Sequence, residues 1–496
     1  MTSEELVKER RSEAWRAELR AELKTKDRLL IQRVEMPALD GKYRATNHEE
    51  VNQGLTAEQA RTEASRCIDC PNPTCMTGCP VSIHIPTFVK NIERGEFVEA
   101  ARVLRETSSL PGVCGRVCPQ EKQCEAQCFY TVKMQRKDPV AIGYLERFAA
   151  DFERQEIEAG RVQDQTVKAE PNGIKVAVVG SGPAGLSCAG DLAKLGYSVT
   201  VFEALHDVGG VLRYGIPEFR LPNEIVDFEI DQLRQLGITF ETNTIVGKTI
   251  SYEDLKEEGF KAIFVGSGAG LPRFMHIPGE NLVGVSSSNE YLTRVNLMGA
   301  GRAGSDTPVL QGKRVAVIGG GNTAMDSVRT ALRLGAERAM IIYRRSEEEM
   351  PARIEEVHHA KEEGVEFLTL HNPVEYLDDG NGRVAGMRLQ KMELGEPDAS
   401  GRRRPVPIEG AIEEVPVDQV IVSVGVSPNP LIPNNFKGLE TSKWHTIIVD
   451  DDSLQSSLPN VFAGGDIVRG GATVILAMGD GRKAAAGIDR YLQSRQ

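Results

Sequence analysis

The spacing of hydrophobic and polar positions changes once along the chain, near residue 165. Before that point, apolar residues recur at helical spacing between cysteine-rich loops, as in IPTFVKNIERGEFVEAARVLRE (85–106). After the polar stretch EAGRVQDQTVKAEPNG, short apolar runs typical of buried strands alternate with helical patterns. This alternation is typical of parallel α/β units, so the pattern predicts a helical domain at residues 51–165 followed by an α/β part.

Residues 1–50 form a separate, strongly charged extension. Its pattern predicts a helix over residues 3–24 and then the poorly patterned link LDGKYRATNHEEVNQGL. We interpret this extension as a solvated helix and a tether. Thr56, with Gln59 three positions later, fits a capping box and predicts that a helix begins there.

Length and charge limit the possible functions. A chain of 496 residues is expected to form two to four domains. The formal net charge of −12 argues against broad binding to nucleic acid or to anionic membranes. No apolar run approaches the ~18 residues of a membrane span. The N-terminal stretch MTSEELVKERRSEAWRAELRAEL has no apolar signal-peptide core. These observations predict a cytoplasmic protein.

A first glycine-rich loop follows the apolar run 174–179 and precedes a helical pattern. Its glycines Gly180, Gly182 and Gly185 have the dinucleotide-binding spacing. The first permits a tight turn, the second lets the backbone approach a pyrophosphate, and the third lets the helix pack on the strand. A second strand ends at Glu203, where a carboxylate can accept hydrogen bonds from a ribose diol. Strand, loop, helix and terminal acid together predict a dinucleotide site.

A second glycine-rich loop, Gly319-x-Gly321-x-x-Ala324, follows the apolar run 313–318. Its second strand ends at Arg344 and Arg345 instead of at an acid. A guanidinium group suits a 2′-phosphate, because it offers several donors in one plane. The opposite terminal charges of the two units indicate two different dinucleotides, FAD at the first and NADPH at the second.

A third feature near the C-terminus agrees with a flavin site. An apolar strand leads to Gly465 and Asp466, and a Gly-Ala-Thr turn then opens a helix. Asp466 is expected to hydrogen-bond the ribityl chain, and the helix N-terminus near Ala472 and Thr473 to stabilise negative charge on a reduced flavin.

These units resemble the two-dinucleotide-binding flavoprotein disulfide-reductase superfamily. The resemblance implies an FAD-binding domain made of residues 172–290 and 429–496, with an NADPH-binding domain at 291–428 inserted between them. IFVGSGAG (263–270) and VIVSVGVSPNP (420–430) are similar to the crossovers between such domains.

Eight of the nine cysteines lie between Cys67 and Cys128, in CIDCPNPTCMTGCP and CGRVCPQEKQCEAQC. Disulfides, zinc and iron–sulfur clusters all use cysteine, but a reducing cytosol disfavours disulfides. The nucleotide domains hold no CxxC pair, because Cys188 is single, so a flavin there needs another exit for electrons. Redox-inert zinc would offer none, whereas CxxC-x₄-C-x₃-CP resembles ferredoxin runs whose last cysteine serves a second cluster. The cysteines therefore indicate iron–sulfur clusters.

From residue 55 onward the chain resembles the family of the NADPH-dependent glutamate synthase small (β) subunit. Similar relatives are the large subunit of electron-bifurcating ferredoxin:NADP⁺ oxidoreductase and the N-terminal half of dihydropyrimidine dehydrogenase. The resemblance rests on CGRVCPQ, GSGPAG, GGVLRYGIPEFRLP, GGGNTAMD, YRRSEEEMPA and GGD, in that order. It implies an α/β two-dinucleotide-binding (Rossmann-like) flavoprotein with an N-terminal α-helical domain carrying two 4Fe–4S clusters. The implied cofactor residues are, for FAD, Gly180, Gly182, Pro183, Ala184, Gly185, Glu203, Gly210, Gly465, Asp466, Ala472 and Thr473, and for NADPH, Gly319, Gly321, Asn322, Thr323, Ala324, Arg344 and Arg345.

The resemblance also implies how the cysteines divide. Cluster one would be held by Cys67, Cys70, Cys75 and Cys128, and cluster two by Cys79, Cys118, Cys124 and Glu146. Glu146 matches the non-cysteine ligand of the family in the stretch IGYLERF, which leaves Cys114 as a spectator. The alternative is two all-cysteine clusters that include Cys114.

The resemblance implies an NADPH-oxidising electron-input subunit of glutamate synthase, which passes electrons through FAD and 4Fe–4S clusters to a large subunit that makes glutamate. The alternative is the large subunit of an electron-bifurcating, or sulfide dehydrogenase-like, ferredoxin:NADP⁺ oxidoreductase, because SSSNEYLTRVNLM (286–298) is similar to that branch. The partner would then be a small chain with FAD and a 2Fe–2S centre. A non-catalytic assembly subunit is disfavoured by the intact glycine loops and the full ligand set.

Overall fold

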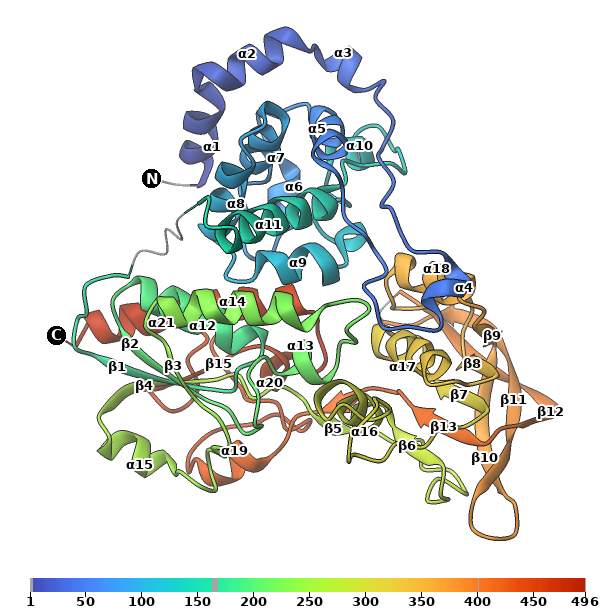
Figure 1. Cartoon of the computed structure of the whole chain (residues 1–496). Helices are drawn as coiled ribbons and strands as arrows, with labels where there is room; N and C mark the ends of the chain where they lie inside the picture. The colour runs from blue at the N-terminus through green and yellow to red at the C-terminus, as the bar shows by residue number, and fades with distance from the viewer. Residues whose placement is uncertain (1–2, 163–167, 400, 496) are drawn as a thin grey trace.

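The computed structural model describes residues 3–162, 168–399 and 401–495 and has a helical N-terminal part on top of an α/β part (Figure 1). The helical part packs short helices around the cysteine-rich loops. Its elements are α5 (Ala57–Ser65), α6 (Thr74–Thr77), α7 (Ile85–Arg94), α8 (Phe97–Arg105), α9 (Pro111–Val117), η1 (Gln120–Lys122), α10 (Phe129–Val132) and α11 (Ile142–Glu158).

Local sequence explains where these helices begin and end. The capping box predicted at α5 is confirmed: the Thr56 hydroxyl accepts from the Gln59 amide, and the Gln59 side chain accepts from the Thr56 amide. Helix α7 has Pro86 in its first turn, where a missing N–H costs nothing, and ends at Gly95 with a φ of +90°. Phe88, on the inward face of α7, is fully buried.

The N-terminal extension folds into α1 (Ser3–Ser12), α2 (Ala14–Glu22), α3 (Thr25–Arg28) and α4 (Gly41–Arg44). The first three helices arch over the helical part, and the chain then descends to place α4 beside the α/β part (Figure 1). The interpretation of this extension as a solvated helix and a tether is wrong, because Arg16, Arg28 and Arg44 are only 2%, 1% and 2% exposed. Each pairs with a carboxylate that lies far away in sequence, which a local charge pattern does not reveal.

The first parallel sheet is built from two distant segments of the chain. Its strand order is β15–β4–β1–β2–β3, with β1 (Lys175–Val179), β2 (Ser198–Phe202), β3 (Thr239–Glu241), β4 (Phe260–Val265) and β15 (Val461–Ala463). Helices α12 (Pro183–Lys194), α14 (Asn223–Gln235) and α21 (Val474–Gln493) cover the face toward the helical part, and their apolar side chains form one continuous core with it. The opposite face is covered by α15 (Tyr252–Glu257) and α19 (Leu431–Asn435), while α13 (Val211–Tyr214) and α20 (Asp466–Arg469) lie near the strand ends.

The second parallel sheet has the order β6–β13–β7–β8–β9. Its strands are β6 (Val285–Ser287), β7 (Arg314–Ile318), β8 (Arg338–Tyr343), β9 (Glu366–Thr369) and β13 (Gln419–Val422), so the sheet begins ahead of residue 291. One face packs on α16 (Ser288–Leu292), α17 (Asn322–Arg333) and α18 (Ile354–Glu362), with the single-turn elements η2 (Thr293–Leu297) and η3 (Glu347–Glu349) nearby.

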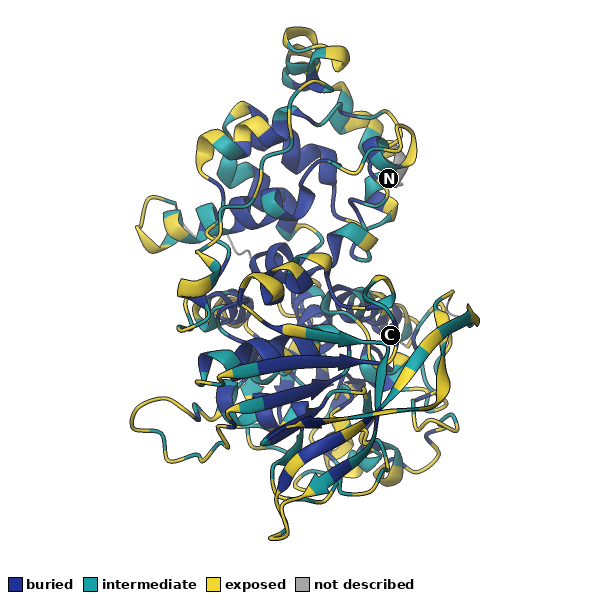
Figure 2. Cartoon of the chain, turned by 90° about the vertical axis from the view of Figure 1, so that its right-hand side faces the viewer, coloured by how far each residue is buried: buried dark blue, intermediate teal, exposed yellow. Residues whose placement is uncertain are grey.

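The other face of the second sheet packs on an antiparallel sheet that is not among the predicted elements. It consists of β10 (His371–Asp378), β11 (Val384–Pro397) and β12 (Arg403–Pro416). The strands β11 and β12 form a long hairpin, and most residues of β12 are exposed (Figure 2).

Two crossovers join the sheets side by side. The segment 263–270 leads into β5 (Leu271–Pro272), and the segment 420–430 contains β14 (Val426–Ser427). These two short strands pair antiparallel between the two halves of the α/β part (Figure 1). Both crossovers therefore lie side by side at the junction of the two parallel sheets.

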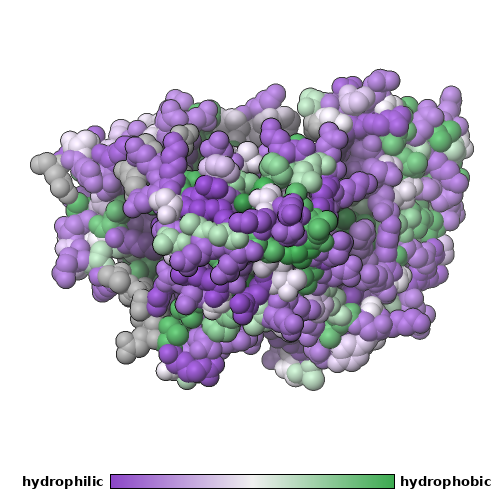
Figure 3. Space-filling model, turned by 90° about the horizontal axis from the view of Figure 1, so that it is seen from above, coloured by the Kyte–Doolittle hydropathy of each residue, from purple (hydrophilic) through white to green (hydrophobic). Residues whose placement is uncertain are grey.

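The surface seen from the N-terminal end is mostly hydrophilic (Figure 3). Figure 3 looks onto the end that bears the N-terminal helices, where hydrophilic residues dominate and hydrophobic ones form small groups among them. Within the described ranges, no helix is both long and apolar enough to cross a membrane.

Candidate functional site

The first glycine loop joins β1 to α12 and leaves a cradle at the N-terminus of that helix. Gly180 has a φ of +98°, and a Cβ there would come within 2.6 Å of the Gly266 carbonyl oxygen. A Cβ on Gly185 would lie 1.9 Å from the Gly180 oxygen, so strand and helix meet too closely for a side chain. At Gly182, in contrast, an added Cβ would meet nothing within 4 Å. This open position, beside unpaired helix N–H groups, fits a pyrophosphate.

Glu203 follows β2 at the edge of this cradle, and its carboxylate is held by backbone groups. It accepts hydrogen bonds from the amides of Ser181 and Leu205, both at 2.9 Å. The Ser181 hydroxyl also donates to it, so the buried carboxylate is fixed in orientation. A fixed acid at this place is suited to accept from a ribose hydroxyl.

The C-terminal segment closes the same cradle from the other side. An added Cβ at Gly465, where φ is +76°, would lie 2.9 Å from the Ala184 Cβ, so the segment packs directly on the first turn of α12. The Asp466 carboxylate accepts from the Ala472 amide at 3.0 Å, and burial raises its pKa to about 6. Thr473 caps the N-terminus of α21. Asp466 and the N-terminus of α21 thus reach one place, as the flavin interpretation requires.

The second glycine loop repeats this geometry between β7 and α17. Gly319 has a φ of +140°, and a Cβ there would lie 2.2 Å from the Ser423 carbonyl oxygen. At Gly321 the nearest atom to an added Cβ is a Pro351 carbon 4.0 Å away, so this position is open. Asn322 begins α17, and its side-chain oxygen accepts from the Arg353 amide at 2.9 Å.

The two arginines after β8 have different environments. Arg344 is exposed and has no ion pair in the described part of the chain. Arg345 is buried, donates to the Asp398 carboxylate at 2.7 Å and donates to the Arg403 carbonyl oxygen at 2.8 Å. Arg345 thereby ties β8 to the tip of the β11–β12 hairpin, while Arg344 is available to a phosphate.

Both glycine loops open into one cavity of about 1330 Å³ between the two sheets. Val117 and Pro119, which flank Cys118, also line it. Gly185, Gly465 and Ala324 do not line it; they act in packing behind its wall. The predicted cofactor residues that line it are Gly180, Gly182, Pro183, Ala184, Glu203, Gly210, Asp466, Ala472 and Thr473 on one side, and Gly319, Gly321, Asn322, Thr323, Arg344 and Arg345 on the other.

The cysteines gather into two groups in the helical part. In the first group, Cys67, Cys70, Cys75 and Cys128 are close enough to influence one another electrostatically, although Cys128 comes from the second run. Burial, followed by the neighbouring thiols Cys67 and Cys128, raises the pKa of Cys70 to about 12. Buried thiols with raised pKa values stay protonated until a metal displaces the protons.

The second group contains Cys79, Cys118, Cys124 and Glu146, and Cys114 lies close to it, within electrostatic range of Cys79 and Cys118. Glu146 is within electrostatic range of Cys79, Cys118 and Cys124. Burial raises the pKa of the Cys79 thiol to about 11. Burial, with a smaller contribution from Glu229, raises the pKa of Glu146 to about 8. Among the described residues, Glu146 Oε1 has no hydrogen-bond partner.

The chemistry of these two groups fits iron–sulfur clusters. Within the described ranges, no three His, Cys, Asp or Glu side chains are close enough to share one metal ion. All nine cysteines are free thiols. In a cubane each protein ligand binds a different iron, which sets the ligands farther apart than those of one ion. A buried carboxylate without a partner beside three thiols is costly unless it binds something, and iron is a suitable partner.

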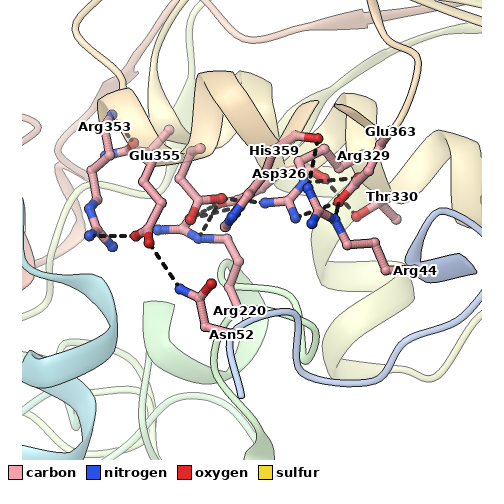
Figure 4. Close-up of polar contacts among 12 residues, drawn as sticks. Arg44, Asn52, Arg220, Asp326, Arg329, Thr330, Arg353, Glu355, His359 and Glu363 are labelled. Atoms are coloured by element: carbon pink, nitrogen blue, oxygen red, sulfur yellow. Dashed lines mark hydrogen bonds and ion pairs between the residues drawn. The ribbon is translucent and has the colours of Figure 1, made fainter. Parts of the chain in front are cut away.

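A charged junction between the two nucleotide loops was not predicted (Figure 4). Arg220, from the GIPEFRLP stretch, donates to both oxygens of Asp326 on α17, each at 2.7 Å. Arg353 donates to the Arg116 carbonyl oxygen at 2.6 Å and to Gln120 at 3.0 Å, next to the cluster-two cysteines. Arg220 lies within a motif of the sequence and Arg353 directly follows one, but the partners of both are set by tertiary contacts alone.

Comparison with known proteins agrees with this geometry. Residues 44–158 match the family described as dihydropyrimidine dehydrogenase domain II, 4Fe–4S cluster, and residues 174–481 match the pyridine nucleotide-disulphide oxidoreductase family. The glutamate synthase [NADPH] small chain of Escherichia coli (strain K12) is 38% identical over 469 residues, 93% of this chain and 98% of that protein.

Two further proteins show how widely this architecture occurs. The NADPH-Fe(3+) oxidoreductase subunit beta of Geobacter sulfurreducens (strain DL-1 / KN400) is 37% identical over 94% of this chain and 70% of that protein. The solved structure of Mycobacterium tuberculosis FprA in complex with NADPH has a TM-score of 0.55 at 21% identity, covering 66% of this chain and 85% of that chain, which is a likeness of fold.

The fold, the cavity shared by two glycine loops and the full-length similarity lead to one assignment. The two curated relatives are named as a small chain and as a subunit beta. The chain belongs to the glutamate synthase small-chain family: it is an oxidoreductase with an FAD- and NADPH-binding part of the pyridine nucleotide-disulphide oxidoreductase type and an N-terminal 4Fe–4S domain.

Proposed function

We propose that this protein is the electron-input subunit of a glutamate synthase, which oxidises NADPH and passes electrons to a larger subunit that makes glutamate. The observation that carries the proposal is the single cavity, because it is lined by both glycine loops and by Val117 and Pro119 of the cluster-two loop. A donor, a flavin and a cluster can meet there without a large rearrangement of the chain.

The residues of the cavity bind and orient the two dinucleotides. FAD held there would supply hydride acceptance from NADPH and one-electron release, so the protein contributes position and electrostatics more than acid–base chemistry. We assign the open position at Gly182 and the N-terminus of α12 to the FAD pyrophosphate, and Asp466 to the ribityl chain. We assign Gly321 and the N-terminus of α17 to the NADPH pyrophosphate, and Arg344 to its 2′-phosphate.

The two cysteine groups would hold two 4Fe–4S clusters in sequence. We assign Cys79, Cys118, Cys124 and Glu146 to cluster two, next to the cavity, and Cys67, Cys70, Cys75 and Cys128 to cluster one beyond it. The support for this order is that Cys118 directly follows Val117 in the chain, and Val117 lines the cavity.

The proposed large subunit is tested by purifying the protein with the chain that accompanies it in its own host. We expect a larger partner, and we expect the complex to form glutamate at the expense of NADPH. A small partner with FAD and a 2Fe–2S centre, together with NADPH-linked ferredoxin turnover and no glutamate, would replace the proposal by the ferredoxin:NADP⁺ oxidoreductase alternative.

A further inference from the structure

The loop between two proposed ligands of cluster one has an unusual backbone at Asp69. This residue lies between Cys67 and Cys70 with a φ of +53°, in the left-handed region that Asp adopts more readily than most residues. Its side chain is 0% exposed. Burial raises the pKa of the Cys67 thiol overall, although the backbone N–H of Asp69 is close enough to the Cys67 sulfur to oppose that rise. The conformation of Asp69 therefore decides whether this N–H points at the sulfur.

The N-terminal helices hold Asp69 from outside. Arg16 and Arg20, both on α2, form ion pairs with the two oxygens of its carboxylate. Arg11, on α1, donates to its carbonyl oxygen at 2.9 Å. Three arginines of one extension thus converge on a single residue of the cluster-one loop.

The same side of the loop receives two more cations. Arg28 and Lys90 both donate to the Cys67 carbonyl oxygen, and both pair with Glu93. The residues Arg16, Arg20, Arg28 and Lys90 outnumber the carboxylates of Asp69 and Glu93 in this group. Nearby positive charge favours the more negative, reduced form of a cluster, and N–H···S bonds act in the same direction.

We propose that residues 3–28 form an arm that clamps the CIDC loop and sets the reduction potential of cluster one, with Arg16 and Asp69 as positioning residues. The arm fixes the loop backbone through Asp69 and surrounds Cys67 with cations. This role rests on the proposed assignment of cluster one to Cys67, Cys70, Cys75 and Cys128. It gives the charged extension a function that its sequence pattern alone did not indicate.

The test compares Arg16→Gln and Asp69→Asn in the full chain by redox titration followed with electron paramagnetic resonance. Cys67→Ala first identifies the signal of cluster one. We expect Arg16→Gln to lower the midpoint potential of that signal, because a cation is lost, and Asp69→Asn to raise it, because an anion is lost. The signal of cluster two stays at its wild-type potential in both variants. A purely structural role would not shift the two variants in opposite directions.

Arg10→Gln is the matched control. Arg10 belongs to the same arm and also forms an arginine–carboxylate ion pair, with 2.9 Å between its guanidinium group and the Glu106 carboxylate. Glu106 lies outside the CIDC loop, at the surface. We expect its potentials to equal those of the wild type.

Iron release to a chelator provides a second readout. Because removing one partner leaves the other charge buried and unpaired, we expect cluster one to lose iron at least ~10-fold faster in Arg16→Gln and Asp69→Asn. Loss of cluster one during purification, with cluster two retained, supports the same role. Unchanged potential and unchanged iron release in both variants would overturn the arm proposal. Retention of both clusters in Cys67→Ala would instead overturn the cluster assignment.

Discussion

The sulfur of Cys114 lies 3.5 Å from the sulfur of Met478, and this contact joins α9, which precedes Cys118, to α21, whose N-terminus lines the cavity. Cys114 is on α9, one turn before Cys118, and Met478 is in the second turn of α21. The Cys118 thiol also donates to Cys114. Cys114 is thus engaged in packing between the two sites, whereas Glu146 Oε1 has no partner in the described part of the chain.

This difference predicts which residue completes cluster two. We expect the Cys114→Ala variant to retain all its iron, because the Cys114 side chain makes packing contacts and binds no iron. We expect Glu146→Ala to lose or convert cluster two, because the fourth iron loses its protein ligand. Iron counting and electron paramagnetic resonance on both variants provide the measurement. Iron loss in Cys114→Ala alone would favour the all-cysteine arrangement.

The two open glycines predict a crossed pattern of cofactor loss. Gly182→Ala and Gly321→Ala should both fold, since an added Cβ meets nothing closer than 4.0 Å at either site. The methyl group would occupy pyrophosphate space, so Gly182→Ala should be purified without flavin, and Gly321→Ala should retain flavin but bind NADPH weakly. Flavin absorbance and NADPH titration test this.

Gly185→Ala is the contrasting control for that pair. Its Cβ would lie 1.9 Å from the Gly180 carbonyl oxygen, so we expect a poorly folded protein instead of a folded one without flavin. Equal stability of Gly185→Ala and Gly182→Ala would contradict the packing role of the third glycine.

Arg344 and Arg345 are predicted to affect nucleotide preference differently. Hydrogen bonds to charged groups contribute about 1.5–3 kcal/mol, so Arg344→Gln should raise the KM for NADPH roughly 10- to 100-fold and leave the KM for NADH unchanged. Arg345→Gln removes the tie to Asp398 and should impair both nucleotides to a similar degree. Steady-state kinetics with both nucleotides separates the two roles, and a selective NADPH defect only in Arg345→Gln would reverse the assignment.

Glu363 predicts a pH dependence of stability. Burial alone would raise its pKa, but the guanidinium groups of Arg329 and Arg333 outweigh burial and lower it from 4.5 to about 2. Because the folded-state pKa is depressed, the stabilisation is complete above about pH 5 and is lost as the pH falls from 4.5 toward 2. A shift of this size corresponds to roughly 3 kcal/mol.

Glu363→Gln should therefore have a lower free energy of unfolding than the wild type at pH 6. At pH 4 the difference in the free energy of unfolding between the two proteins should be smaller. Urea unfolding followed by circular dichroism at both pH values measures the difference. The partly exposed ion pair between Arg338 and Glu366 provides a control. The variant Glu366→Gln should have little effect on the free energy of unfolding at either pH. A difference for Glu363→Gln that does not change with pH would contradict the ion-pair explanation.

Local chemistry let the sequence determine much of this protein. A glycine at 180 or 319 is required because only a residue without a Cβ tolerates φ values of +98° and +140° against a neighbouring carbonyl, so the loops were visible as motifs. The capping box at Thr56 acts within three residues and was equally visible. Period and spacing also predicted a helical part followed by parallel α/β units.

Tertiary structure decided what depends on partners far away in sequence. It paired Arg44 with Glu363 and Arg16 with Asp69, and so anchored, through buried arginines, an extension whose charges alone indicated solvent. It separated Arg344 from Arg345 by giving only the second a carboxylate partner within the described residues. The physical reason is that a charged side chain is compatible with either water or a buried counter-charge, and only the folded chain determines which of the two it meets.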